Sequence, residues 1–198
     1  MYPNTIPPEA SQAEKKVFDA FQRQLSTGYT VIYHLPFQEL DWQRIRRDRE
    51  IDFVLGHAEF GILVIEVKGG GIRRYAETGR CTTTDRRGRT TLIRDPFEQA
   101  KDGRGYITRA LERRFGPGAT RRICFGHAVA FPDTRGFTGP LPFAGREILM
   151  FQNDLRDVNA WAQRAQHYYR RHMARPRRPV ERALAFLVDM WGRDIKFE

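Results

Sequence analysis

The chain is poor in the features that mark secreted and membrane proteins. Its 198 residues include two cysteines, Cys81 and Cys124, which are too few for a disulfide scaffold or a zinc tetrad. No apolar run approaches the roughly 20 residues that a membrane-spanning helix needs. Residues 1–8 show neither the basic start nor the apolar stretch of a secretory signal. We therefore expect a cytoplasmic location and no membrane partner.

Motifs that would indicate other chemistries are also missing. The sequence contains no glycine-rich phosphate loop of the ATPase type, and its five histidines do not follow a metal-binding spacing. Acidic residues are in deficit, because 24 Asp and Glu stand against 34 Lys and Arg, which gives a net charge of +10. This balance favours a polyanionic partner, and nucleic acid fits it better than a membrane surface does.

The pattern of apolar residues predicts one α/β domain. Ser11 and Glu14 have the spacing of a capping box at the start of the first helix, and Asp95 followed by Pro96 can begin the second. Short runs with the alternation and β-branched content of strands lie between and after these helices. The predicted helices cover residues 9–25, 95–115, 154–172 and 180–191, and the predicted strands cover residues 30–35, 50–55, 61–68, 122–131 and 147–151.

Two polar segments interrupt this pattern. Residues 38–49 are polar and basic and are expected to form a loop, whereas residues 69–94 predict a β-hairpin or a mobile excursion with a turn near residues 85–88. The order helix, three strands, helix, strand predicts a mixed sheet flanked by helices. We expect residues 1–173 to form the domain. Residues 174–198 are expected to form a basic linker and a C-terminal helix that could lead into a further domain.

Glu66 and Lys68 are the first candidates for chemistry. They are two residues apart on one predicted strand, so their side chains lie on the same face. Apolar residues occupy both faces of that strand, as in a strand buried at the centre of a sheet. An acid and a base in such a place are unfavourable unless they are paired with each other or bound to a metal.

Asp52 lies on the preceding strand, where Ile51, Phe53 and Leu55 are expected to share the opposite face. If the hairpin is centred on Glu59, Asp52 stands directly opposite Glu66, and directly opposed Cβ atoms are about 5 Å apart. A shift of the pairing by one residue would separate them. Two adjacent carboxylates repel each other, which favours a divalent cation between them. Oxygen ligands of this kind indicate Mg²⁺ or Mn²⁺.

A second interpretation of the same residues involves no metal. A Glu-x-Lys triplet arises by chance about once in a chain of this length at average residue usage. Glu66 and Lys68 could therefore form a buried structural ion pair. Only their combination with Asp52 across a predicted hairpin makes the metal site the more specific interpretation.

Several of these runs resemble the nuclease-related domain (NERD) family, which is assigned to the PD-(D/E)XK nuclease superfamily. The resemblance covers roughly residues 10–131 and is most specific in the Glu-Ile-Asp-Phe run of residues 50–53 and the run of residues 61–69. It implies a restriction-endonuclease-like αβββαβ core, a divalent metal and hydrolysis of nucleic-acid phosphodiesters. Ile51 stands where the superfamily name has proline, at a position that varies widely.

The resemblance also gives three other residues a role. It implies that Glu14 faces the metal site as an outer ligand or water-positioning group, and that Gln99 lies near the active site. The residues alone leave both open, since Glu14 fits a capping box and Gln99 fits an ordinary solvated helix turn. The main-chain carbonyl of Val67 is a candidate for a further metal ligand.

Basic residues cluster after the candidate catalytic strand. From residue 70 to residue 125, 14 Lys and Arg stand against 6 Asp and Glu. Phosphate contacts from such a cluster would fix affinity and position without reading the base sequence. Tyr75 or Tyr106 could stack on bases or could simply pack within the protein. The candidate phosphate-binding residues are Arg44, Arg46, Arg47, Arg73, Arg74, Arg86, Arg87 and Arg89.

The sequence therefore predicts a metal-dependent nuclease with Mg²⁺ or Mn²⁺ and with DNA preferred over RNA. In this prediction Asp52 and Glu66 bind the metal and Lys68 orients or activates water. The main alternative is a non-catalytic nucleic-acid-binding accessory domain, a degenerate nuclease within a larger helicase-like protein. A protein-interaction scaffold is the third interpretation.

Overall fold

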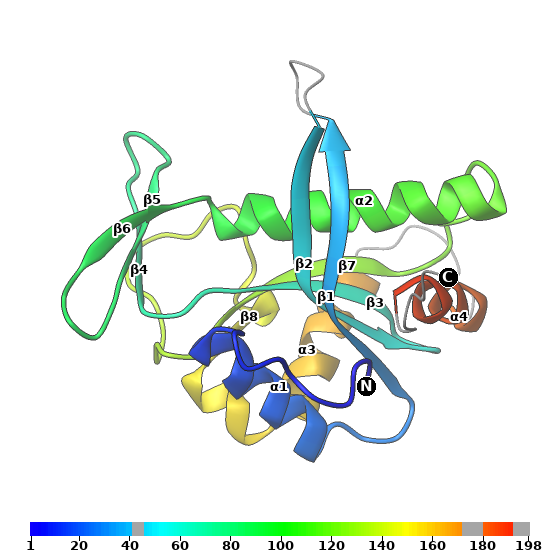
Figure 1. The fold of residues 1–198 in the computed structure, drawn as a ribbon, viewed down its shortest axis with the longest axis horizontal. Helices are drawn as coiled ribbons and strands as arrows, with labels where there is room; N and C mark the ends of the chain where they lie inside the picture. Colours follow the sequence, from blue (N-terminus) through cyan, green and yellow to red (C-terminus); the bar gives the residue numbers. More distant parts are fainter. Residues whose placement is uncertain (41–45, 172–179, 192–198) are drawn as a thin grey trace.

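The computed structural model describes residues 1–40, 46–171 and 180–191 (Figure 1). Five strands form a mixed sheet in the order β1-β2-β3-β7-β8, with β3 at the centre. The strands are β1 (Tyr29–Leu40), β2 (Arg46–His57), β3 (Gly61–Val67), β7 (Phe125–Phe131) and β8 (Leu149–Phe151). The helices are α1 (Gln12–Gln24), α2 (Pro96–Phe115), α3 (Val158–Arg171) and α4 (Glu181–Trp191), with 3-10 turns η1 (Arg146–Ile148) and η2 (Gln152–Arg156).

Helices cover both faces of this sheet. One buried cluster joins the apolar stripe of α1, including Phe18 and Phe21, to Trp161 of α3 and to one face of the strands. The other joins Leu111 of α2 and Leu187 of α4 to the opposite face. Figure 1 shows α1 and α3 together below the sheet, with α2 running across its upper part. No helix in the described residues is long and apolar enough to cross a membrane.

The strand pairing agrees with the predicted topology. β2 and β3 form an antiparallel hairpin in which Phe53 pairs with Ile65 and His57 with Gly61, so its centre falls at Glu59 as expected. β7, which follows α2, adds to β3 in parallel. The element order α1, β1, β2, β3, α2, β7 is the αβββαβ core of a restriction-endonuclease-like fold, with α3 and α4 after it.

The loop expected at residues 38–49 is wrong in its extent. β1 continues to Leu40 and β2 already begins at Arg46, so the two strands form a long antiparallel ribbon. Gln38 pairs with Asp48, and its Nε2 donates to Asp48 Oδ1 at 3.1 Å. This part of the ribbon lacks hydrophobic alternation because its exposed side chains have no core to face.

A second, three-stranded sheet separates β3 from α2. It contains β4 (Gly71–Arg74), β5 (Cys81–Thr84) and β6 (Thr90–Ile93), all antiparallel. The turn predicted near residues 85–88 is present, since Asp85 Oδ1 accepts hydrogen bonds from the backbone N–H groups of Arg87 and Arg89. The predicted hairpin therefore exists and carries one further strand. We call β4–β6 the small sheet below.

The predicted faces of β2 are only partly right. Phe53 and Leu55 enter the cluster beneath α1 and α3, but Ile51 enters the opposite cluster beneath α2. The neighbouring strand shifts at the same level, with Tyr33 in the first cluster and Leu35 in the second. Both strands therefore exchange faces around one pair of opposed positions, residues 34 and 52.

Candidate active site

Asp52 lies where β2 and β3 separate. The printed pairing of the two strands ends at Phe53 with Ile65, one position before Asp52 and Glu66 would be opposed. Here the Asp52 side chain replaces the β2 backbone as the hydrogen-bond partner of β3, because its Oδ2 accepts a hydrogen bond from the Val67 N–H at 2.7 Å. This bond fixes the carboxylate of Asp52 beside the end of β3.

Glu66 and Lys68 form the close pair that their spacing predicts. Lys68 Nζ lies 2.6 Å from Glu66 Oε1. Asp52 and Glu66 are only 8% and 3% exposed, whereas the Lys68 side chain retains 24% of its exposure and reaches the surface. The ion pair considered as the alternative to a metal site is thus present, next to a second buried carboxylate that it does not include.

The charges at this point are incompletely balanced. Burial, followed by repulsion from Glu66, raises the pKa of Asp52 well above its ordinary value. Burial also raises the pKa of Glu66, although Lys68 opposes the shift. Burial lowers the pKa of Lys68, but the carboxylates of Glu66, Asp52 and Glu14 outweigh it and raise the pKa overall. Lys68 is therefore an ammonium that faces more negative charge than it can neutralise.

Glu14 faces the same place from α1. Its backbone N–H donates to Ser11 Oγ at 3.1 Å, so one half of the predicted capping box forms. Its carboxylate accepts a hydrogen bond from the Tyr33 hydroxyl at 2.6 Å, and this bond, after burial, contributes to raising the pKa of Tyr33. The charge of Glu14 also acts on Asp52 and Lys68. The structure thus brings Glu14 to the carboxylate cluster.

Gln99 lines a pocket of about 380 Å³ beside the cluster. Glu50 and Arg94 line the same pocket, and the charges of both act on Glu66. Glu50 was not singled out as a site residue from the sequence. Its position two residues before Asp52 is the signal that could have found it, because alternate residues of a strand share a face.

A larger pocket of about 570 Å³ opens between the N-terminal segment and the β1–β2 ribbon, and Glu14, Tyr33, His34 and Glu50 are among its lining residues. His34 has a φ of 59°, the only positive φ outside glycine in the described part of the chain. Its Nδ1 lies 3.5 Å from Glu50 Oε2. Nothing in the sequence indicated this conformation, although histidine adopts it more readily than most residues do.

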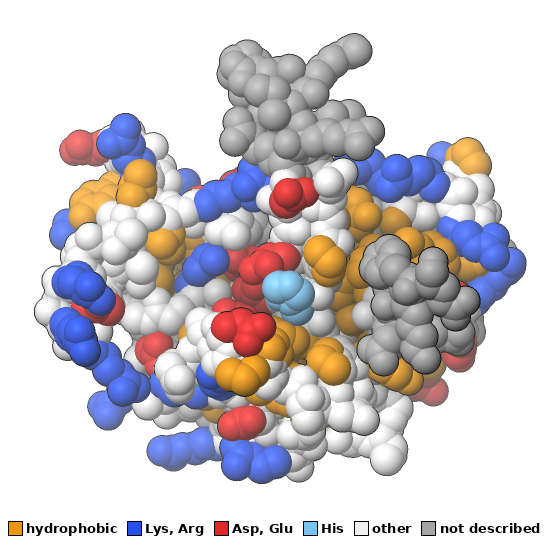
Figure 2. Space-filling view, viewed as in Figure 1, with side chains coloured by type: hydrophobic (Ala, Val, Ile, Leu, Met, Phe, Trp, Pro, Cys, Tyr) orange, Lys and Arg blue, Asp and Glu red, His pale blue; other side chains and the backbone are white. Residues whose placement is uncertain are grey.

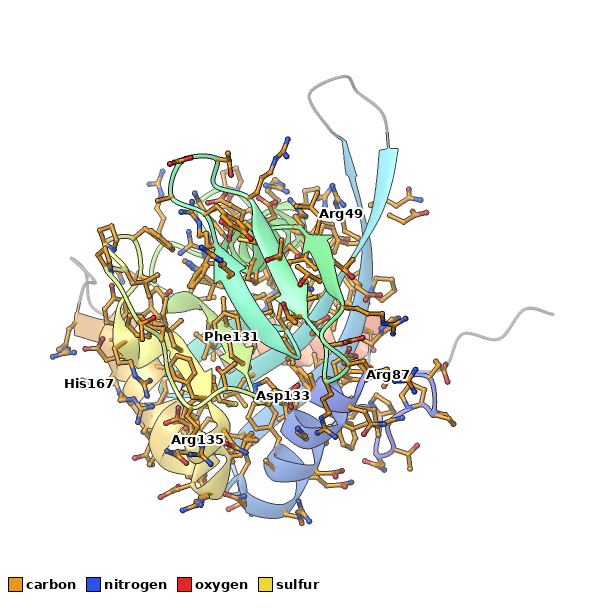
Figure 3. The ribbon with its side chains drawn as sticks, turned by 90° about the vertical axis from the view of Figure 1, so that its left-hand side faces the viewer. Arg49, Arg87, Phe131, Asp133, Arg135 and His167 are labelled. Carbon is orange, nitrogen blue, oxygen red and sulfur yellow. The ribbon has the colours of Figure 1, made fainter. Side chains whose placement is uncertain are left out.

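The predicted phosphate-binding residues are spread over two regions. Arg73 and Arg74 lie on β4, while Arg86, Arg87 and Arg89 lie in and after the β5–β6 turn. Figure 2 shows acidic side chains near the middle of one face, with Lys and Arg along the small sheet. In Figure 3, Arg87 and Asp133 lie near α1 at the lower end of that sheet. Arg46 and Arg47 belong to β2, but their side chains are not described, and Arg44 lies outside the described residues.

Two of these arginines already have acidic partners. Arg74 Nε lies 3.0 Å from Asp95 Oδ2, and Arg89 Nε lies 2.9 Å from Asp85 Oδ2. The Arg86 charge acts on Asp133, which also contacts Lys16 and accepts a hydrogen bond from the backbone N–H of Gly70 at 2.9 Å. The β5–β6 turn therefore lies close to the segment that directly follows Lys68.

The donor groups fit a hard divalent cation with much of its water retained. No group of three or more His, Cys, Asp or Glu side chains that could hold a metal gathers within the described ranges. Asp52 and Glu66 nevertheless supply two buried carboxylates, and Lys68 pairs directly with only one of them. The Lys68 N–H donates to the Ala130 carbonyl on β7, so the Val67 carbonyl on the other side of the same peptide bond points away from β7. It points to the side on which the Val67 N–H donates to Asp52. Mg²⁺ is commonly held by one or two carboxylates and several waters.

Comparison with known proteins gives one match. The family model described as "Nuclease-related domain" covers residues 9–132. The chain belongs to the NERD family. No curated protein and no solved structure matches it. The NERD segment spans α1 to β7 and contains Glu14, Asp52, Glu66, Lys68 and Gln99 together with the whole small sheet.

Membership of the NERD family makes the chain nuclease-related and implies an interaction with nucleic acid. The carboxylate cluster at the end of β2 and β3 and the arginines of the small sheet both lie within the matched segment.

Proposed function

We propose that this NERD protein is a metal-dependent nuclease that hydrolyses phosphodiester bonds, with Mg²⁺ or Mn²⁺ as its cofactor and DNA preferred over RNA. The observation that carries the proposal is the meeting of Asp52 and Glu66, both buried, with the Lys68 ammonium at the point where β2 and β3 separate. Such a surplus of buried negative charge favours a cation.

In the proposed site, Asp52, Glu66 and the Val67 carbonyl hold the metal. The bound ion would polarise the phosphate and stabilise the charge that develops on its oxygens. Lys68 reaches the surface as a cation, so it can hold the scissile phosphate or orient the attacking water. Attack of a water oxygen on phosphorus forms one P–O bond and breaks the bond to the leaving oxygen. The attacking water gives up its proton to bulk water, and the leaving oxygen takes up a proton from bulk water.

Glu14 and Gln99 complete the proposed site from the two helices. The Tyr33 hydroxyl holds Glu14 Oε2, which leaves the other carboxylate oxygen able to orient water. Gln99 lines the adjoining pocket and offers both a donor and an acceptor. Both residues are proposed to position water or phosphate.

The basic residues supply the proposed contacts to substrate. Arg73 and Arg74 lie on β4 and Arg86, Arg87 and Arg89 in the β5–β6 turn, all within the segment that continues from β3. Arg46 and Arg47 belong to β2, and Arg44, which lies outside the described residues, is proposed to act with them. Phosphate contacts from these two regions would hold nucleic acid across the carboxylate cluster and make binding sensitive to salt.

A cleavage assay tests the proposal. The purified protein is incubated with matched DNA and RNA substrates in Mg²⁺, Mn²⁺ or EDTA. We expect cleavage of DNA that EDTA stops and that Asp52→Asn and Lys68→Ala abolish, whereas Asp19→Asn, at an exposed position of α1, leaves it unchanged. Cleavage that survives both substitutions would place the chemistry elsewhere.

A non-catalytic nucleic-acid-binding domain is the second candidate, because Lys68 already neutralises Glu66 directly. In that case the chain would serve as an accessory domain of a larger helicase-like protein. Salt-sensitive binding that ignores metal, without any cleavage, would favour this function in a filter-binding assay.

A further inference from the structure

The two arginines of β4, Arg73 and Arg74, lie over aromatic rings. The Arg74 guanidinium carbon lies 4.8 Å from the centre of the Phe143 ring, and that of Arg73 lies 4.7 Å from the centre of the Tyr75 ring. Phe143 is 50% exposed and Tyr75 is 38% exposed. The two rings therefore combine a large exposed aromatic surface with adjacent positive charge.

Phe143 is held in a fixed position by its neighbours. The Phe97 ring meets it edge-on at a centroid distance of 5.1 Å, and Phe97 in turn packs near Phe131 at the end of β7. Arg74 is fixed by its ion pair with Asp95, the N-terminal cap of α2. A ring and a guanidinium that are both anchored lose little freedom when a ligand stacks on them.

The Phe143 ring is close to the proposed catalytic pocket. Asp95 and Phe97 stand in the first turn of α2, between Arg94 and Gln99, which both line the pocket of about 380 Å³. The same helix turn thus supports the aromatic surface on one side and the pocket on the other.

Tyr106 provides a contrast within the same chain. Its ring stacks on Phe37 at 4.4 Å and meets Trp191 at 6.2 Å, beside the buried cluster beneath α2 and α4. Of the two tyrosines that could stack on bases, Tyr106 packs within the protein and only Tyr75 is exposed under an arginine.

We propose that Phe143 with Arg74 forms a stacking platform for unpaired nucleobases, and that Tyr75 with Arg73 offers a second stacking site on the other face of β4, so that the nucleic acid bound by this protein is single-stranded next to the catalytic site. The inference rests on the proposed function, of which it specifies the substrate class. Each base has a π face that an aromatic ring can stack on, and the arginine beside each ring attracts the phosphates. A duplex keeps these faces within its own stack, so the platform discriminates against it.

The charge around the rings favours nucleic acid over an apolar protein partner. A third guanidinium, that of Arg146, lies 4.5 Å from the centre of the Phe151 ring, and the half-exposed Phe137 stacks on the same ring at 6.2 Å. Phe151 itself is only 2% exposed, so Phe137 is the ring that this group presents to solvent. Exposed aromatic rings with arginine nearby are the arrangement that sequence-tolerant binding of single strands uses.

Binding measured without metal tests the platform apart from catalysis. Fluorescence anisotropy in EDTA compares a labelled 20-nucleotide single strand with the 20-base-pair duplex of the same sequence. We expect Phe143→Ala to weaken binding of the single strand about tenfold and of the duplex less than twofold. Phe143→Trp should restore the affinity, and Tyr75→Ala should act in the same direction as Phe143→Ala.

Leu92→Ala is the matched control, because Leu92 is an exposed apolar residue of β6 in the same small sheet and has no aromatic ring. It should leave both affinities unchanged. The thermal midpoint of each variant checks that the fold is intact. Equal loss of single-strand and duplex binding in Phe143→Ala, or no loss in either ring variant, overturns the platform.

A cleavage assay with the same oligonucleotides separates this inference from the function on which it rests. If Asp52→Asn abolishes cleavage while Phe143→Ala binds the single strand normally, the nuclease stands and the platform is wrong. If Phe143→Ala selectively loses single-strand binding but the unaltered protein cuts nothing, the platform stands and the nuclease is wrong.

Discussion

Replacing Asp52 by Asn should separate the stability of the fold from its proposed chemistry. The side chain keeps its shape, and the Asn oxygen can still accept the hydrogen bond that the Val67 N–H now donates to Asp52 at 2.7 Å. The charge disappears from a site that is only 8% exposed, and Glu66 no longer has a second buried carboxylate to repel. Without metal, the variant should therefore be more stable than the original protein at neutral pH.

The direction follows from the raised pKa of Asp52. Because burial and Glu66 raise this pKa above its ordinary value of 3.8, the native state binds the proton more tightly than the unfolded state does. The free energy of unfolding is then highest below that ordinary value and falls as pH rises through the native pKa, by up to about 1.36 kcal/mol per pH unit. Asp52→Asn removes this loss of stability at higher pH. Glu66, whose pKa is also raised, still causes a smaller loss of stability in the same direction.

We expect a gain of about 2 kcal/mol for Asp52→Asn at pH 7 in EDTA, the size typical of an uncompensated buried polar group. For a chain of this length that gain raises the thermal midpoint by about 4–8 °C. The assay is thermal unfolding from pH 4 to pH 8, with and without Mg²⁺. Mg²⁺ should stabilise the original protein, by about 2.7 kcal/mol at 100 times its dissociation constant, and should leave the variant unchanged.

Three outcomes would refute this reasoning. A variant that is less stable in EDTA would mean that the Asp52 charge is well compensated. A gain in stability that is the same at pH 4 and at pH 8 would mean that the gain does not come from the titration of Asp52. A variant that Mg²⁺ stabilises as strongly as the original would mean that Asp52 does not hold the metal.

Five further substitutions test three other parts of the structure. Lys68→Ala leaves Glu66 buried without its partner and should lower the free energy of unfolding in urea by about 3 kcal/mol at pH 7. The loss should be smaller at pH 5, because Glu66 can then take up a proton. An equal loss at both pH values would contradict the pairing. His34→Gly should be at least as stable as the original protein, because the φ of 59° suits glycine. His34→Val should be less stable than the original protein by about 1–2 kcal/mol, because a β-branched residue does not suit that φ. The reverse order of stability in thermal unfolding would disprove the conformation. Gly103→Ala should lower the free energy of unfolding by about 1–3 kcal/mol, because the added Cβ would lie 2.8 Å from Ile51 Cγ1. Gly105→Ala on the same helix meets only the flexible end of Arg109 and should raise the free energy of unfolding by up to about 1 kcal/mol. Equal effects of the two substitutions would contradict the close approach of α2 to β2.

The sequence predicted best those features that have a local cause. Ser11 begins α1 and Asp95 with Pro96 begins α2, because capping depends on a few consecutive residues. The centre of the β2–β3 hairpin at Glu59 followed from the length of its loop and the alternation of its strands. The meeting of Glu66 with Lys68 then followed from strand geometry alone.

Features that depend on distant contacts were not predictable in this way. The outer part of the β1–β2 ribbon is polar because it faces solvent, so hydrophobic alternation could not reveal it. The positive φ of His34 and the exchange of faces at residues 34 and 52 arise where two strands bend together. The metal, the substrate and the roles of Glu14, Gln99 and Val67 remain predictions.

The central position of β3 affects the order in which parts of the protein unfold on heating. Glu66 belongs to the strand that pairs on both sides, with β2 and with β7, and every residue of that strand is buried. Amide hydrogens there should exchange with deuterium only through complete unfolding, while those of the small sheet, which is mostly exposed, should exchange through local opening. Moderate warming should therefore open the small sheet before it disturbs the carboxylates, and any nucleic-acid contacts that this sheet makes should be lost reversibly.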